Sequence, residues 1–334
     1  MEKQTVKKWK YRIAFLLAAL LFVFLTWEGA RYLRPQRKTF GSMWEQYLAE
    51  PEESLDVLMV GSSIVYCDVI PAAVWEESGI KSYVMAGPEQ TIPISCAYVR
   101  EACRSQKPQA ILLEMSGMFF REYQDYTKAN LSTMPFSWNR FYAAFTAAEP
   151  AERLGICFPL YNYHYRWTEA KGEELAEHRD VQPDLLAGYT CLNTVSPQKL
   201  QENNERVLDT ETYAENLKAV LRLRDFCDRR GIRLIPYFAP CAARNPDALR
   251  KTLRDDLEAA GLPLCDLSIP TEDMHISMET DWQDWLHFNV FGAEKFSVWL
   301  GGYLRDELDI RTEQPDTSLW EKRAARLHEL MAGA

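Results

Sequence analysis

The sequence lacks the motifs that mark several common enzyme classes. It contains no Walker-type phosphate loop, no His-Glu-x-x-His pair and no paired-carboxylate pattern, which argues against nucleotide-dependent, zinc-dependent and glycosidase chemistry. Its eight cysteines include no Cys-x-x-Cys pair, so we expect no metal site and no cofactor. The chain also has no internal repeat and no low-complexity tract. If the protein is an enzyme, we therefore expect its side chains to catalyse the reaction without a metal ion or cofactor.

Positive charge is scarce relative to negative charge. The chain has 38 Lys and Arg against 48 Asp and Glu, a net charge of −10, which argues against non-specific binding of nucleic acid. With 47% hydrophobic and 26% charged residues, the composition is that of a globular protein, neither disordered nor a multi-pass membrane protein. A length of 334 residues allows one large α/β domain with insertions, or two small domains.

Cysteine usage leaves the redox compartment open. The eight residues are scattered, and several, such as Cys157 and Cys265, lie in apolar contexts typical of small buried hydrophobic side chains. We expect mostly free thiols, although an even number of cysteines permits disulfides in an oxidising compartment.

Long apolar runs are absent except at the N-terminus. Several basic residues precede an uninterrupted apolar run over Ile13–Leu25. This run is shorter than the about 20 residues that usually span a bilayer. Tyr11 and Trp27 can nevertheless lie at the two interfaces, and Arg12 can extend its charge to water. We expect a transmembrane anchor over residues 13–30 and a membrane partner for this segment.

Two alternatives to the anchor stay open. A cleaved signal peptide suits an apolar segment of this length, but the Thr-Trp-Glu-Gly-Ala after Leu25 offers no small-x-small cleavage site. A buried helix of a soluble protein is the other alternative. Basic residues flank the run on both sides, so charge gives little bias, and we place the N-terminus inside because the large domain follows. The expected location is the cell membrane, single-pass, with the main domain on the extracytoplasmic side.

From residue 54 onward, short apolar runs alternate with amphipathic stretches, which is typical of βαβ units and a parallel sheet. Near-continuous apolar strands are buried on both faces. The pattern therefore predicts a three-layer α/β/α sandwich around a mainly parallel five-stranded sheet. The expected strands cover residues 55–60, 82–86, 110–114, 233–238 and 264–267.

The remaining segments divide the chain as follows. Helices are expected at about 212–230, 246–260 and 290–308, the first two ending at Gly231 and Gly261. A proline-broken, aromatic-rich stretch at about 120–205 predicts an insertion of short helices and loops. The expected divisions are a basic cytoplasmic N-terminus (1–12), the anchor (13–30), a linker (31–53), the α/β domain (54–310) and a C-terminal tail helix (311–334).

A candidate nucleophile follows the first strand. In open parallel sheets, reacting groups collect at the carboxyl ends of the strands, and this strand ends in Gly61-Ser62-Ser63. A hydroxyl at a sharp strand-to-helix turn is exposed, and its amide points with the helix amides toward a developing oxyanion. The same tripeptide also suits a plain turn with a helix N-cap.

A candidate base lies near the C-terminus, in Asp284-Trp285-Leu286-His287. An Asp three residues before a His can accept the Nδ1–H bond and leave Nε2 to take a proton from a serine. The pair precedes an expected helix at the edge where the first strand ends. His275 is the alternative base.

The combination resembles the SGNH or GDSL-type hydrolases. Their first block is a strand followed by Gly-Asp-Ser or, in some branches, Gly-Ser-Ser, whose last serine is the nucleophile and matches Ser63. Their last block, Asp-x-x-His, matches Asp284 and His287, and their second block contributes a glycine amide at the position of Gly87. The resemblance implies a flavodoxin-like SGNH fold and an oxyanion hole formed by the amides of Ser63 and Gly87.

The resemblance has one gap. The third block, Gly-x-Asn-Asp, should follow the third strand, where this chain has Glu114-Met115-Ser116-Gly117 and no Asn. With the anchor and the Gly-Ser-Ser form, the chain looks most like the membrane-anchored Gram-positive branch, which includes the teichoic-acid D-alanine-transfer and polysaccharide O-acetylation proteins. Such proteins often work beside a membrane-bound O-acyltransferase, so the resemblance implies that partner.

Other residues are weaker candidates for substrate binding. Trp282 and Trp285 flank the expected acid and could stack on a sugar ring, or pack against the core. His164 and Arg166 could hold an anionic or polyol substrate, or form a structural polar cluster. Glu114 could bind a sugar hydroxyl at the strand end, or be buried with a structural role.

The sequence thus predicts a serine esterase or O-acyltransferase acting on small acyl esters of a cell-surface glycan or polyol. The alternatives are a non-catalytic binding or assembly protein of the same fold, and an intracellular esterase whose first 30 residues pack on its surface. Water as acceptor would give an esterase, and a sugar hydroxyl would give a transferase.

Overall fold

The computed structural model describes residues 2–33, 44–120, 124–168, 181–312 and 315–333. Five parallel strands form the central sheet, in the order β2-β1-β3-β5-β7. Their bounds are β1 Val57–Gly61, β2 Ser82–Ala86, β3 Ala110–Glu114, β5 Arg233–Phe238 and β7 Cys265–Asp266. A second, two-stranded parallel pair joins β4 Gln201–Glu202 to β6 Ala243–Arg244.

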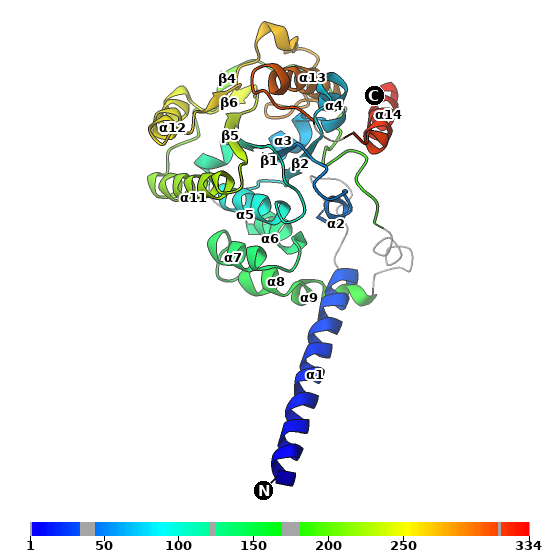
Figure 1. The fold of residues 1–334 in the computed structure, drawn as a ribbon. Coiled ribbons are helices and arrows are strands. Elements are labelled where there is room, and N and C mark those ends of the chain that lie inside the picture. The colour runs from blue at the N-terminus through cyan, green and yellow to red at the C-terminus, as the bar shows by residue number, and fades with distance from the viewer. Residues whose placement is uncertain (1, 34–43, 121–123, 169–180, 313–314, 334) are drawn as a thin grey trace.

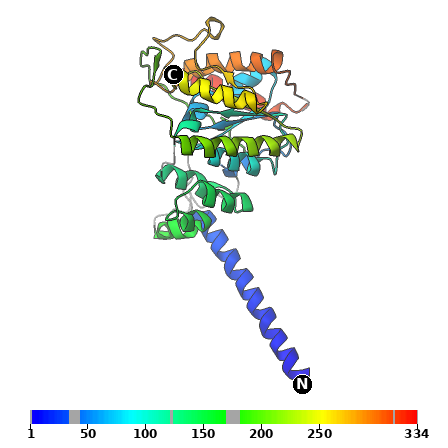
Figure 2. The ribbon, with the colours of Figure 1, turned by 90° about the vertical axis from the view of Figure 1, so that its left-hand side faces the viewer.

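Helices cover both faces of the sheet, so the predicted three-layer α/β/α class is confirmed (Figure 2). Because side chains alternate along a strand, each strand contributes side chains to two hydrophobic cores, one on each face of the sheet. Leu58 and Val60 pack with α5 (Ile92–Ala102) and α11 (Thr210–Asp228). Val57 and Met59 pack with α4 (Pro71–Ser78) and α13 (Val290–Asp306). Burial on both faces explains why the strands are mostly apolar.

The strands over 82–86, 110–114 and 233–238 have the predicted bounds. The first strand begins two residues later than expected, at Val57, and the last is shorter, at Cys265–Asp266. The edge strand β7 pairs with β5 through only two residue pairs, which explains its length. α12 (Asp247–Ala259) and α13 lie within two residues of the predicted helices.

The described part of the predicted insertion contains four short helices and a 3-10 turn, followed by a segment over residues 186–201. The helices are α6 Gln124–Thr133, α7 Trp138–Thr146, α8 Arg153–Cys157 and α9 Pro159–Tyr163, and η2 (His164–Thr168) follows them. α9 and η2 contact α1 (Glu2–Leu33) where that helix leaves the body of the protein (Figure 1). Part of the expected insertion, residues 121–123 and 169–180, lies outside the described residues, as do residues 34–43 of the expected linker.

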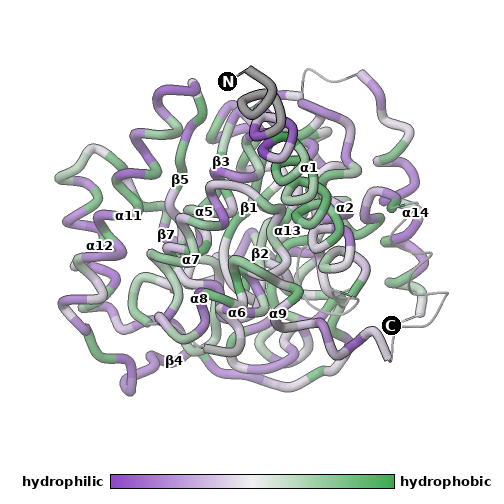
Figure 3. Tube along the Cα trace, turned by 90° about the horizontal axis from the view of Figure 1, so that it is seen from below, coloured by the Kyte–Doolittle hydropathy of each residue, from purple (hydrophilic) through white to green (hydrophobic). Residues whose placement is uncertain are grey.

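α1 projects away from the rest of the molecule (Figure 1), and its middle part is hydrophobic (Figure 3). Over Lys8–Ala30, 23 residues, it is long and apolar enough to cross a membrane, and none of its most apolar window is buried. Its length and composition fit a membrane anchor and a signal sequence alike.

The return segment, defined here as residues 186–201, runs along the carboxyl edge of the sheet and is fastened by backbone hydrogen bonds. Val84 N donates to Ala187 O at 2.9 Å, and Thr190 N donates to Tyr66 O at 2.7 Å. Gly188 has φ +90°, and a Cβ at this position would lie 2.2 Å from the carbonyl oxygen of Val84. Only glycine therefore allows the segment to approach β2 so closely.

The C-terminal helix α14 (Ser318–Gly333) packs against α4 beside the α/β core (Figure 1). Trp320 and Leu327 are buried, and the fully buried guanidinium of Arg323 pairs with the buried carboxylate of Glu50. Glu50 follows the short helix α2 (Trp44–Leu48). This ion pair ties the end of the chain to the segment that precedes β1.

Candidate active site

Ser63 is the first residue of α3 (Ser63–Asp68), directly after the turn that ends β1. A Cβ on Gly61 would lie 2.6 Å from Val65 Cγ2 and 2.8 Å from Glu114 Cβ, so glycine permits the tight crossing from strand to helix. Ser62 has an extended backbone, with φ −95° and ψ −156°, and forms the N-cap. The hydroxyl of Ser63 is thereby presented at the carboxyl edge of the sheet.

Three side chains form a continuous hydrogen-bonded chain at this edge. His287 Nε2 lies 2.8 Å from Ser63 Oγ. His287 Nδ1 lies 2.9 Å and 3.0 Å from the two carboxylate oxygens of Asp284. With Nδ1 protonated toward Asp284, Nε2 is free to accept the serine proton, which is the arrangement of a serine hydrolase triad.

Hydrogen bonds keep the Asp284 carboxyl ionised. Burial by itself would raise its pKa, but the bond from His287 and the amides of Leu286 and His287 outweigh burial and lower the pKa below its ordinary value. Asp284 Oδ1 accepts those amides at 2.7 Å and 3.0 Å. The carboxylate therefore fixes the backbone of the loop between residues 284 and 287 and also holds the orientation of the His287 imidazole.

The loop that carries the base is anchored to the helix that carries Ser63. Asp68, at the end of α3, is fully buried, and its Oδ1 accepts the Phe288 amide at 2.8 Å. Burial raises the pKa of Asp68 well above its ordinary value. Downstream, Asn289 caps α13 by accepting the amides of Phe291 and Gly292. The position of His287 is thus fixed from both sides.

A cleft of about 270 Å³ opens beside Ser63. Several polar residues that line it were not predicted from the sequence: Glu89, Asn203, Arg206, Arg244 and Asn245. Asn203 and Arg206 follow β4 in the segment that closes the insertion, and Arg244 belongs to β6. A partial signal was present for Asn245, because it follows the carboxyl end of β5 in an Asn-Pro turn.

Glu114 and Ser116 occupy the edge where the resembled family has its third block. Glu114 is buried, and its carboxylate accepts the Ser116 amide at 3.1 Å and the Ser116 hydroxyl at 2.7 Å. Burial raises the pKa of Glu114 to about 7, against the lowering effect of the Ser116 bonds. Ser116 lines the cleft, and Asn245 Nδ2 lies 3.4 Å from its Oγ. Glu114 therefore supports Ser116 and does not itself line the cleft.

Gly87 follows β2, the neighbour of β1, at the same edge of the sheet. A Cβ there would lie 2.3 Å from Asn130 Oδ1, and Asn130 Nδ2 donates to Pro88 O at 2.9 Å. Asn130 belongs to α6, so the insertion packs directly on the glycine turn. The role of the Gly87 amide in an oxyanion hole stays a prediction.

The structure separates the weaker candidates. Trp285 is 49% exposed and lines the cleft. Trp282 is 0% exposed and packs on Phe288 with ring centroids 4.4 Å apart, so it cannot stack on a sugar. The bridge between Trp282 and Phe288 turns this indole toward the core.

His164 and Arg166 also lie elsewhere. Both belong to η2 beside α1, where Arg166 Nη1 donates to Leu33 O at 2.8 Å, and neither lines the cleft. The alternative base His275 is exposed, in a left-handed conformation with φ 54° at the end of η3 (Glu272–Met274), and Ser63 bonds to His287 instead.

No cluster of three or more His, Cys, Asp or Glu suited to a metal ion occurs among the described residues. All eight cysteines, each within a described range, are free thiols.

Comparison with known proteins adds little to this geometry. The chain matches no protein-family model and no curated protein. It is similar to the solved structure of an acetyl xylan esterase, Est2A, from the rumen bacterium Butyrivibrio proteoclasticus. The identity is 9% and the TM-score 0.36, over 78% of this chain and 66% of the other, so this chain spans slightly less than two thirds of that protein. Because both values are this low, function is inferred below from the site and not from this likeness.

Proposed function

We propose that this protein is a serine esterase or O-acyltransferase of the SGNH type, held at the membrane by α1. The observation that carries the proposal is the hydrogen-bonded chain from Asp284 through His287 to Ser63, with distances of 2.9 Å and 2.8 Å. Ser63 and His287 are 224 residues apart in the sequence, and they meet beside a cleft at the carboxyl edge of a parallel sheet, where active sites commonly form.

The first half of the reaction acylates the serine. Ser63 Oγ attacks the ester carbonyl carbon while its proton passes to His287 Nε2, and Asp284 stabilises the imidazolium. The tetrahedral intermediate then expels the alcohol, which receives the proton from His287. The amides of Ser63 and Gly87 are the proposed oxyanion donors, because both follow strands that end beside each other.

The second half transfers the acyl group to an acceptor. His287 takes a proton from water or from a sugar or polyol hydroxyl, and the acceptor oxygen attacks the acyl-serine. The tetrahedral intermediate then breaks the bond between the acyl carbon and Ser63 Oγ, and His287 returns the proton to Oγ. Water gives hydrolysis, and a hydroxyl gives transfer. The cleft of about 270 Å³ suits a small acyl group, and Trp285, Arg206 and Asn245 supply an aromatic face and polar groups for a glycan or polyol.

Labelling with a fluorophosphonate probe tests the proposal without a known substrate. The full chain in mild detergent should be labelled covalently, and Ser63→Ala should abolish labelling. Ser62→Ala is the matched control, since Ser62 is the adjacent serine and also lines the cleft. Equal labelling of the native protein and Ser63→Ala would refute the nucleophile.

A second candidate is a non-catalytic binding protein of the same fold that partners a membrane-bound O-acyltransferase. The observation in its favour is the lack of an Asn after β3, where Ser116 instead commits its hydroxyl to Glu114. Absence of labelling in a folded native protein, together with capture of the acyltransferase, would favour this candidate over the enzyme.

A further inference from the structure

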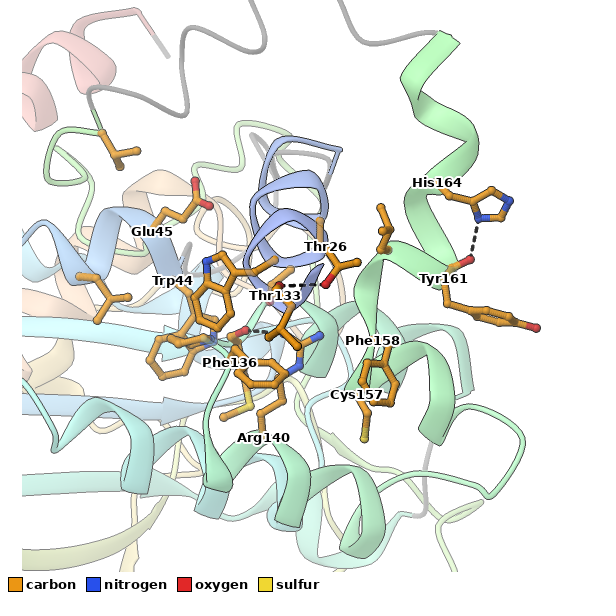
Figure 4. A pocket seen from close by; sticks show the side chains of 18 of the residues that line it. Thr26, Trp44, Glu45, Thr133, Phe136, Arg140, Cys157, Phe158, Tyr161 and His164 are labelled. Atoms are coloured by element: carbon orange, nitrogen blue, oxygen red, sulfur yellow. Dashed lines mark hydrogen bonds between the residues drawn. The ribbon is translucent and has the colours of Figure 1, made fainter. Parts of the chain in front are cut away.

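A large cavity lies between α1 and the insertion, apart from the cleft beside Ser63. Its volume is about 950 Å³, at the upper end of the about 300–1,000 Å³ typical of small-molecule sites. One wall is the side of α1 that carries Phe22, Val23, Thr26, Trp27 and Ala30. Residues of α2, of the helices α6 to α9 and of the loop before α7 form the opposite wall (Figure 4).

The two walls meet through aromatic and aliphatic contacts. Trp27 packs edge-on against Phe136 with ring centroids 5.1 Å apart. A Cβ on Gly29 would lie 3.9 Å from Leu160 Cδ1, so α9 approaches this side of the helix closely. Trp44, Phe136 and Phe158 surround the side of α1 that carries Thr26 (Figure 4).

Most of the lining side chains are apolar, and several of the polar groups among them are bonded to the protein itself. Thr26 Oγ1 donates to the Phe22 and Val23 carbonyls at 3.0 Å and 2.9 Å. Arg140 Nε donates to Ile156 O at 2.7 Å, and its Nη1 donates to Met134 O at 3.0 Å. Because these donors already have acceptors, the cavity offers an apolar surface, and an apolar occupant fits it best.

The depth of the cavity follows from helix geometry. From Phe22 to Ala30 the helix rises about 12 Å, at about 1.5 Å per residue. Ala30 ends the segment able to span a membrane, so this wall lies within that segment. With Trp27 at the interface, Phe22 lies about 7.5 Å deeper along the helix, so the cavity opens into the outer part of one leaflet.

The surface around the cavity exposes aromatic side chains, as membrane proteins do at the boundary between lipid and water. Trp138 is 88% exposed and Trp167 is 72% exposed, and Phe145, Phe158 and Tyr161 are also exposed. All five lie between the start of α7 and the end of η2, in the part of the chain that packs near α1. Tryptophan and tyrosine favour the boundary between lipid and water, so this surface suits contact with headgroups.

We propose that this cavity binds an acyl chain of a membrane glycerophospholipid, which enters from the bilayer between α1 and the insertion. The proposal rests on the membrane anchoring proposed above and is independent of the catalytic site. The insertion then lies on the membrane surface, with its exposed aromatic residues among the headgroups.

Photocrosslinking in a defined bilayer tests the proposal. The full chain is reconstituted in phosphatidylcholine nanodiscs that contain a phosphatidylcholine with a diazirine in the middle of one acyl chain, and adducts are mapped after irradiation. Adducts are expected on residues 22–30 and also on the insertion, at 133–136 or 157–161. Adducts confined to α1 would overturn the proposal and favour closure of the cavity by protein, such as a partner helix.

Paired variants sharpen the test. Val23→Trp fills the cavity and should reduce the insertion adducts several-fold. Leu21→Trp adds the same side chain about 200° around the helix, at a position that does not line this cavity, and should leave them unchanged. Leu160→Trp fills from the opposite wall, and the exposed Leu154→Trp is its control. Equal adducts in a filling variant and its control would also overturn the proposal.

Two readouts separate this proposal from the proposed function. Carbonate extraction reports the anchor, and fluorophosphonate labelling of Ser63 reports an intact domain. A protein that stays in the membrane and labels normally, yet gives no insertion adducts, refutes only the acyl-chain site. Extraction by carbonate refutes the anchor and this site together, whatever the labelling result.

Discussion

Glu114→Gln should change how the stability of this protein depends on pH. The carboxyl is buried at the end of β3, and burial raises its pKa to about 7 from an ordinary 4.5. The difference of 2.5 units, at about 1.4 kcal/mol per unit, corresponds to about 3 kcal/mol between the two protonation states.

The sign follows from proton binding. Between pH 4.5 and 7 the folded protein holds a proton on Glu114 that the unfolded chain has released, so stability falls as pH rises through this window. Below the window both states are protonated and the ionisation cost is absent. Above it the cost stays constant. The amide of Gln does not titrate, so Glu114→Gln should lack this loss of about 3 kcal/mol.

Urea unfolding of the full chain in mild detergent, from pH 4 to pH 8.5, measures the effect. The free energy of unfolding of Glu114→Gln minus that of the native protein should rise with pH by about 3 kcal/mol. Other carboxyls cancel in this difference. Ser116→Ala is an informative companion, because it removes a bond that lowers the pKa of Glu114 and should move the window upward. A difference that stays flat across the pH range would refute the burial argument.

Three further predictions concern other parts of the structure. In assays of ester turnover or probe labelling, Asp284→Ala should cost less than His287→Ala, because Asp284 orients the imidazole and His287 moves the proton; the reverse order would contradict these roles. Trp282→Ala should lower the free energy of unfolding by about 3–5 kcal/mol through loss of a buried side chain, whereas Trp285→Ala should spare stability and raise KM for a glycan ester. Equal stability losses for the two tryptophans, measured by urea unfolding, would contradict their placement. Glu50→Ala should destabilise the fold by about 3–5 kcal/mol, because it leaves a buried guanidinium of α14 without its partner; an unchanged unfolding midpoint would argue against that ion pair.

The sheet was predictable because its strands are short apolar runs. Ser82–Ala86 and Ala110–Glu114 have the predicted bounds, since burial on both faces makes all but a terminal residue of each strand apolar. The last strand was predicted over residues 264–267 but covers only Cys265–Asp266. An edge strand with two paired residues has little hydrogen bonding to fix its ends. The β4–β6 pair, with two residues in each strand, carries no periodicity that a sequence could reveal.

The candidate site was predictable only where a local motif describes it. Ser63 and the Asp284–His287 spacing are such motifs, and the structure brings the three together. Arg206, just after the insertion, reaches the cleft through tertiary folding that no local pattern encodes, whereas Asn245 had a partial signal in its Asn-Pro turn after β5. Trp282 and Trp285 look equivalent in sequence, and only the pairing of residues 282 and 288 determines which one faces solvent.

The return segment has a consequence for how this protein can change. It holds the loop that carries His287 at several points: Ser196 N donates to Trp282 O at 2.8 Å, and Thr194 N donates to Gln283 Oε1 at the same distance. Farther along, Gln201 N donates to Ala242 O at 2.8 Å. A residue added to or removed from this segment would therefore displace the loop that carries Asp284 and His287 relative to Ser63, although none of residues 186–201 lines the cleft. The length of a segment that carries none of the proposed catalytic groups is thus constrained as tightly as those groups themselves, and a designer who alters the cleft would have to keep that length unchanged.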